Sequence, residues 1–158
     1  MASTPRALAE AERASVTALA RSGLALQAVG WGCSALAVRW LVQPEAALRD
    51  LSTDEAWERH GRNNPLLRAL AKWTGAFFLA FGLVTAWLGR QQTAGSSELR
   101  ALHRLVGLAW VLDAVAVKFC CFAPSGVVRF WTDSLGAGLI DLAVGCTHLW
   151  RASHLPEA

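Results

Sequence analysis

Two aspartates in apolar surroundings have the clearest chemical potential in this sequence. Asp113 lies near the middle of the apolar stretch 105–123, and Asp141 lies near the middle of 134–150. In lipid a charge at that depth costs about 2.5–3.5 kcal/mol on insertion scales, so such residues face inward and find partners. Two close carboxylates in a low dielectric cannot both ionise and must share a proton. The pair predicts a site for a proton, an ion or a ligand; the alternative is a hydrogen-bonded pair that only fixes helix register.

Three other polar residues extend this candidate polar interior. Gln27 lies in the stretch 22–42 and is expected to offer a donor at a depth comparable to that of the aspartates. His148 follows Asp141 by seven residues, which is two helical turns on one face. Asp141, His148 and His103 predict a line along which protons pass. The alternative for His148 is a side chain that reaches water from a helix end.

Lys118 follows Asp113 by five residues. Five residues of α-helix turn through about 500°, so the two side chains are expected to point about 140° apart. This spacing predicts no salt bridge and makes Lys118 an anchor at the membrane surface. The adjacent Cys120 and Cys121 would end the helix there, as small packing residues or, alternatively, as palmitoylation sites.

Composition favours a membrane protein. The chain has 158 residues, of which 54% are hydrophobic and 17% charged, against about 25% charged in ordinary soluble domains. The net charge of +3 is small and its basic residues are scattered, which argues against nucleic-acid binding. Neither a zinc spacing nor a GxSxG, HExxH or phosphate-loop motif occurs in the sequence. We therefore expect no metal, no cofactor and no catalytic residues, and lean towards a non-enzymatic protein.

Four apolar stretches are long enough to cross a bilayer, since a span needs about 20 residues. They predict an all-α, integral membrane bundle of four transmembrane helices with up-down topology, forming a single domain over 1–158. The expected spans are 22–42, 73–89, 105–123 and 134–150. Residues 1–21 predict an N-terminal polar helix, and 43–72 a long loop with short helices that start at Pro44 and after a capping box of Ser52 and Glu55.

Each span carries a stripe of small or polar residues at helical spacing. In lipid, helices associate through close packing, so such stripes mark the faces that meet. The first stripe contains Gly30 and Ser34, and the third span aligns Val106 and Trp110 with Asp113. The expected packing seam of the second and fourth spans consists of Gly75, Gly82, Gly89, Gly138 and Gly145.

The expected location is a multi-pass integral membrane protein with the lipid bilayer as its surroundings. An even number of spans puts both termini on one side, and the positive charges of the two sides are equal in number. Arg100 and Arg104 belong to a short loop, which favours cytoplasmic termini.

The segment "NNPLLRALAKWTGAFFLAFGLVTAWLG", 63–89, resembles the second span of small four-helix DoxX-like membrane proteins, in which an arginine also precedes a span rich in Gly and Phe. The resemblance implies a four-helix membrane bundle and transfers no functional residue. Three functions stay open. The first is a non-enzymatic accessory or interaction subunit whose glycine seams bind other membrane helices or a second copy. The second is a small carrier of a proton, ion or lipid that uses Asp113 and Asp141, and the third is an enzyme that modifies a lipid or sterol.

Overall fold

The computed structural model describes residues 5–91, 96–122, 125 and 135–155, and every element of regular structure within these ranges is helical. The all-α class is therefore confirmed. The elements are α1 (Pro5–Val42), α2 (Pro44–Leu51), α3 (Asp54–Ala56) with its π-helical continuation η1 (Trp57–Gly61), α4 (Pro65–Arg90), α5 (Ser97–Leu112) with its π-helical continuation η2 (Asp113–Phe122), and α7 (Gly136–His154).

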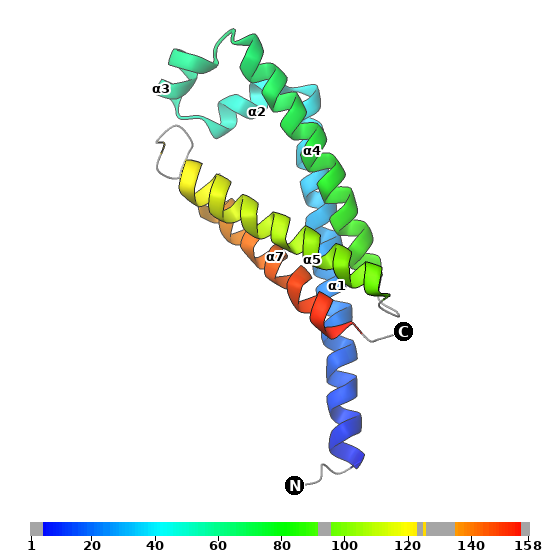
Figure 1. Ribbon diagram of the computed structural model, residues 1–158. Coiled ribbons are helices and arrows are strands. Elements are labelled where there is room, and N and C mark those ends of the chain that lie inside the picture. The colour runs from blue at the N-terminus through cyan, green and yellow to red at the C-terminus, as the bar shows by residue number, and fades with distance from the viewer. Residues whose placement is uncertain (1–4, 92–95, 123–124, 126–134, 156–158) are drawn as a thin grey trace.

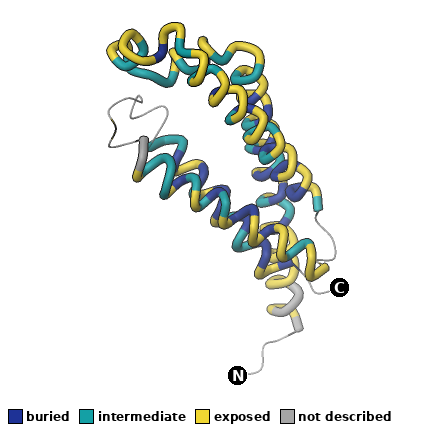
Figure 2. The backbone as a smooth tube through the Cα atoms, turned by 45° about the horizontal axis from the view of Figure 1, so that its top comes forward, coloured by how far each residue is buried: buried dark blue, intermediate teal, exposed yellow. Residues whose placement is uncertain are grey.

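The first helix joins two elements that the sequence separates. The expected polar helix of 1–21 continues into the apolar stretch 22–42 without a break, so α1 has 38 residues. At 1.5 Å per residue this helix is about 57 Å long, well beyond the roughly 30 Å of a bilayer core. Residues 10–18 of α1 are exposed, and this part of the helix projects past the other helices (Figures 1 and 2).

Helix boundaries follow proline and capping side chains. Pro44 starts α2 as expected, but the next helix is capped by Thr53 and not by Ser52: the Thr53 hydroxyl accepts from the Ala56 amide at 3.3 Å. Ser52 instead donates to the Leu48 carbonyl at 2.7 Å, so its hydroxyl belongs to the preceding helix.

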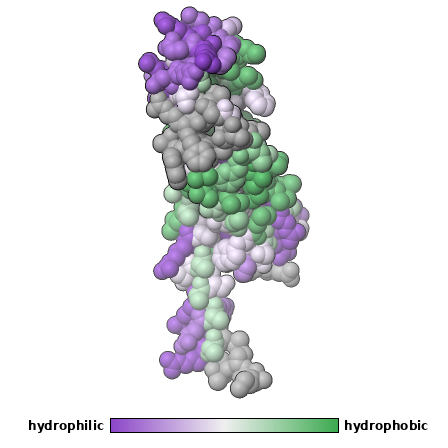
Figure 3. Space-filling view, turned by 90° about the vertical axis from the view of Figure 1, so that its left-hand side faces the viewer, coloured by the Kyte–Doolittle hydropathy of each residue, from purple (hydrophilic) through white to green (hydrophobic). Residues whose placement is uncertain are grey.

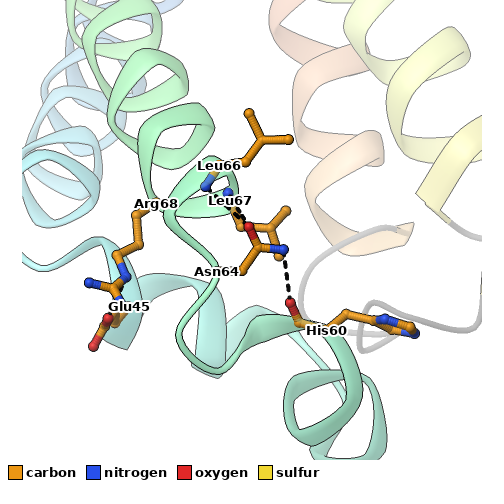
Figure 4. A network of polar contacts seen from close by, with 6 residues as sticks. All are labelled: Glu45, His60, Asn64, Leu66, Leu67 and Arg68. Atoms are coloured by element: carbon orange, nitrogen blue, oxygen red, sulfur yellow. Dashed lines mark hydrogen bonds and ion pairs between the residues drawn. The ribbon is translucent and has the colours of Figure 1, made fainter.

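The entry into α4 is fixed by an asparagine cap and an ion pair (Figure 4). The Asn64 side chain accepts from the Leu66 and Leu67 amides and donates to the His60 carbonyl. One turn later Arg68 contacts the Glu45 carboxylate of α2 at 2.6 Å. These contacts attach the connection between α1 and α4 to the start of α4.

The long helices form two antiparallel hairpins (Figure 1). α1 packs along α4, and α5 with η2 packs along α7. The hairpins contact each other through α1 with α7 and α4 with α5, and they diverge towards the end that carries α2 and α3. We call the region where they meet the junction; it contains the ends of α4 and α7 and the start of α5.

Glycine allows the helices of each hairpin to touch by their backbones. A Cβ on Gly82 of α4 would lie 2.7 Å from the Gly30 carbonyl oxygen of α1. In the second hairpin a Cβ on Gly145 of α7 would lie 2.8 Å from the Gly107 carbonyl oxygen of α5. Of the expected seam, Gly75, Gly82 and Gly89 face α1, whereas Gly138 and Gly145 face η2 and α5.

Several polar residues lie inside this structure and many large apolar residues lie outside, although Leu26, Leu88 and Trp110 are buried. Fully or nearly buried are Ser34, Thr85, His103, Asp141, His148 and Arg151. Exposed apolar side chains occur on every long helix and include Trp31, Leu36, Trp73, Phe77, Leu105, Leu108, Leu112, Val115, Leu139 and Ile140. On the face drawn in Figure 3, hydrophobic residues occupy the middle of the molecule and hydrophilic residues its two ends.

By length and composition, two helices of the described chain are apolar enough to cross a membrane: α1 over Glu10–Val42 and α4 over Pro65–Arg90. The α7 helix is not apolar enough by the same criterion, because Asp141, His148 and Arg151 lower its mean hydropathy. The same three residues are buried, so the low hydropathy of α7 comes from its inner face.

Candidate functional site

The two aspartates meet between α7 and η2. Asp113 is the first residue of η2, and Asp141 lies in α7 with 7% of its surface exposed. Their side chains lie close enough for each carboxyl group to act on the protonation of the other. Two close carboxyl groups in a low dielectric cannot both ionise, so one of them is expected to hold a proton. The geometry thus brings together the two residues that the sequence singles out.

Lys118 completes this group, contrary to the sequence-based prediction. Its Nζ lies 4.0 Å from the Asp113 Oδ2, and its side chain is 14% exposed. The prediction of a surface anchor is wrong because it assumed α-helical geometry. The segment Asp113–Phe122 is a π-helix, in which hydrogen bonds join residues five apart and bring them onto one side. We call Asp113, Lys118 and Asp141 the carboxyl cluster.

The other hairpin closes one side of the carboxyl cluster. The Lys118 Nζ lies 5.6 Å from the centre of the Phe78 ring of α4. Cys33 of α1 contacts the Phe78 carbonyl oxygen with its Sγ at 3.8 Å. The Oδ2 atoms of Asp113 and Asp141 are buried and have no hydrogen-bond partner among the described residues. The cluster therefore holds oxygen acceptors that a proton or a cation can use.

Gln27 does not join the carboxyl cluster. Its amide donates to the carbonyl oxygens of Gly23, at 3.4 Å, and Gly89, at 3.3 Å. Gly89 lies at the end of α4 near the junction, whereas Cys33, six residues further along α1, lies near the carboxyl cluster. Gln27 is thus about 9 Å too far along the helix axis to serve the aspartates, and the expected partnership is wrong.

His148 pairs with His103 at the junction. Their Nδ1 atoms are 2.8 Å apart, and both residues are fully buried. The rings lie 5.0 Å apart between centres and are tilted by 47°. One ring donates and the other accepts, and both Nε2 atoms lack a partner among the described residues. The expected closeness of these two histidines is therefore present, but two turns of α7 separate them from Asp141.

Arg151, one turn beyond His148, is a buried residue that the sequence pattern did not single out. Its Nη1 donates to the Leu19 carbonyl at 2.6 Å and to the Ser22 hydroxyl at 2.9 Å, and its Nη2 donates to the Gln91 carbonyl at 2.8 Å. This guanidinium thereby connects α7 to α1 and to the end of α4. The signal was available, because Arg151 continues the helical stripe of Asp141 and His148 by one turn.

A third polar contact also escaped sequence reasoning. The Trp110 indole N–H of α5 donates to the Thr85 hydroxyl of α4 at 3.0 Å, and both side chains are buried. The Trp110 ring packs on Phe81 with 4.9 Å between centres. No spacing within one helix could have identified this pair, since its residues come from different hairpins.

At the start of α5, hydrogen bonds from its own backbone and from the Ser96 and Ser97 side chains lower the pKa of Glu98. Within the described chain, no three His, Cys, Asp or Glu side chains are grouped so that they could hold a metal ion.

Comparison of the chain with protein-family models, with curated proteins and with solved structures finds no match. The resemblance of 63–89 to DoxX-like proteins therefore stays a prediction. Any functional argument for this chain rests on its own residues.

Proposed function

We propose that the protein is a four-span integral membrane protein that binds a proton at its carboxyl cluster, as a small carrier rather than an enzyme. The spans are 22–42, 73–89, 105–123 and 134–150, in up-down order with cytoplasmic termini. The exposed apolar side chains on α5, η2 and α7 support the third and fourth spans. Soluble monomers rarely expose contiguous apolar patches of that kind.

The observation that carries the proposed function is the meeting of Asp113, Asp141 and Lys118. Two carboxyl groups and one ammonium group form a neutral set when one carboxyl holds a proton. Loss of that proton leaves a net negative charge, which is costly in a low-dielectric interior. The cluster therefore favours one bound proton, and its release requires compensation by a cation or by water.

Infrared spectroscopy of the purified protein in lipid tests this proposal, because a protonated carboxyl has a C=O band that a carboxylate lacks. We expect this band at neutral pH in the wild-type protein and its loss in Asp141→Asn. Glu12→Gln, on the exposed part of α1, is the matched control and should keep the band. Absence of the band in the wild type, or its persistence in Asp141→Asn, would refute the proposed proton site.

Transport is measured separately with the protein in sealed vesicles that contain a pH-sensitive dye. A carrier predicts faster proton entry than in empty vesicles, and a rate reduced to the empty-vesicle value by Asp141→Asn. Equal rates for wild type and Asp141→Asn, with the infrared band present, would assign the proton a structural role and reject the carrier.

An accessory or interaction role is the second candidate, and the N-terminal part of α1 favours it. Residues 10–18 of this helix are exposed, and this part of α1 projects past the junction (Figure 1). Removing residues 2–16 should then leave the stability of the hairpins unchanged and abolish association with other membrane proteins. An unchanged association pattern would refute this role.

A further inference from the structure

We propose that His103 and His148 form a second proton-binding site, in which two rings together take up one additional proton at the junction. This site goes beyond the carboxyl cluster. Seven residues of α7, or about 10 Å, separate His148 from Asp141. The two sites are therefore separate groups of side chains, and a failure of one leaves the other testable.

The geometry of the histidine pair determines how many protons it can bind. A neutral imidazole carries one N–H and one bare nitrogen. At an Nδ1 to Nδ1 distance of 2.8 Å, one Nδ1–H donates to the lone pair of the other ring. The donor ring then has a bare Nε2, and the acceptor ring carries its hydrogen on Nε2. Both Nε2 atoms lack a partner among the described residues, so the pair holds one vacant buried acceptor.

A proton fits this acceptor better than a metal ion does. Zinc and related ions take three or four protein ligands. No third His, Cys, Asp or Glu of the described chain is grouped with the two histidines. Both rings are fully buried, with no exposed surface. A proton requires neither a further ligand nor a cavity, and the existing hydrogen bond between the rings spreads its charge over both.

The charged and polar groups around the histidine pair come from α1, α4, α5 and α7, so proton uptake by the pair affects contacts across the junction. From α7, Arg151 is the cation that acts on both rings. From α1 come the Leu19 carbonyl and the Ser22 hydroxyl, and from the end of α4 the Gln91 carbonyl, all bound to Arg151. From α5 comes His103 itself. A proton on the pair places a second positive charge beside the guanidinium that connects the two hairpins.

Uptake therefore weakens the contact between the hairpins. Like charges repel more strongly in a low dielectric than in water. The Arg151 guanidinium can reduce this repulsion by moving away from the rings, and such a movement breaks its bonds to α1 and α4. The site thus links the protonation state of two histidines to the separation of the hairpins.

Nitrogen NMR of the full chain, labelled in histidine and held in detergent micelles or nanodiscs, tests this inference. The protein has four histidines, and the exposed His60 and His154 serve as internal references. As the pH is lowered, we expect His103 and His148 to change together in one step that adds a single proton to the two rings. Two independent one-proton steps would overturn the inference, as would no change in either ring over the pH range in which the protein stays folded.

Two variants sharpen the test. Arg151→Met removes the neighbouring charge, so the joint step should move to higher pH; an unchanged midpoint would contradict the inference. His154→Gln lies on the same helix outside the pair and should leave the joint step unaltered. If Arg151→Met does not fold, the wild-type titration still decides, because it needs no substitution.

Discussion

A close contact between the backbones of α1 and α4 gives the sharpest prediction of stability. A Cβ on Gly82 would lie 2.6 Å from the Ser34 Oγ, 2.7 Å from the Gly30 carbonyl oxygen and 3.0 Å from the Ser34 amide nitrogen. Two of these atoms belong to the backbone of α1 and cannot rotate away. Gly82→Ala therefore forces the two helices apart or shifts them along each other.

The size of the effect follows from two opposing terms. Replacing glycine by alanine in a helix favours the helix by about 1 kcal/mol. Overpacking a close contact costs about 1–3 kcal/mol. Gly32 provides the matched control: it lies in α1, is exposed, and has no atom within 4 Å of an added Cβ. Gly32→Ala gains the helix term alone, so it should exceed Gly82→Ala in stability by about 1–3 kcal/mol.

The assay is reversible unfolding of the purified protein in mixed micelles with increasing denaturing detergent, followed by far-UV circular dichroism. Because both variants make the same chemical change in a long helix, the difference between them isolates the contact of α1 with α4. Equal free energies of unfolding for Gly32→Ala and Gly82→Ala would refute the close approach of these helices.

Three further substitutions test the polar contacts by the same assay. Thr85→Val removes the acceptor of the buried Trp110 N–H and should cost about 1–3 kcal/mol, whereas Thr85→Ser should restore most of that loss; equal stabilities of the two variants would rule out the hydrogen bond. Lys118→Met deprives Asp113 of its cation and should destabilise the protein more than the double variant Lys118→Met with Asp113→Asn. Additive changes in the free energy of unfolding would exclude coupling between the two side chains. Arg151→Met leaves three acceptors at the junction without their donor and should lower the free energy of unfolding by at least about 3 kcal/mol. A decrease below about 1 kcal/mol would show that the buried guanidinium does not hold the hairpins together.

Local sequence signals located α4 in part: the expected span 73–89 lies within it, but the helix begins at Pro65, inside the expected long loop 43–72. Proline and asparagine at 63–65 end one segment and start α4, and the glycine stripe of 75, 82 and 89 faces α1. Both features depend on residues close together in one helix, whose spacing can be read directly. The same reading identified Asp113 and Asp141 as neighbours, because their stretches are similar in length on either side of a short connection.

Other features depend on geometry that spacing does not encode. Lys118 reaches Asp113 because η2 is π-helical, and no residue in that segment signals the change of helical period. Cys120, seven residues after Asp113, lies in the same π-helical segment and is exposed. The angle between the hairpins is a tertiary property set at the junction.

Insertion of a short epitope tag at four places, with antibody access compared in intact and permeabilised vesicles, tests the four-span account most directly. The places are beside Arg59, Ser97, Ser125 and His154. Four spans predict that the tags at Arg59 and Ser125 share one side of the membrane and that those at Ser97 and His154 share the other. If the tag at Ser125 is found on the side of Ser97 and His154, then α5, η2 and α7 do not cross the membrane, and the account is contradicted.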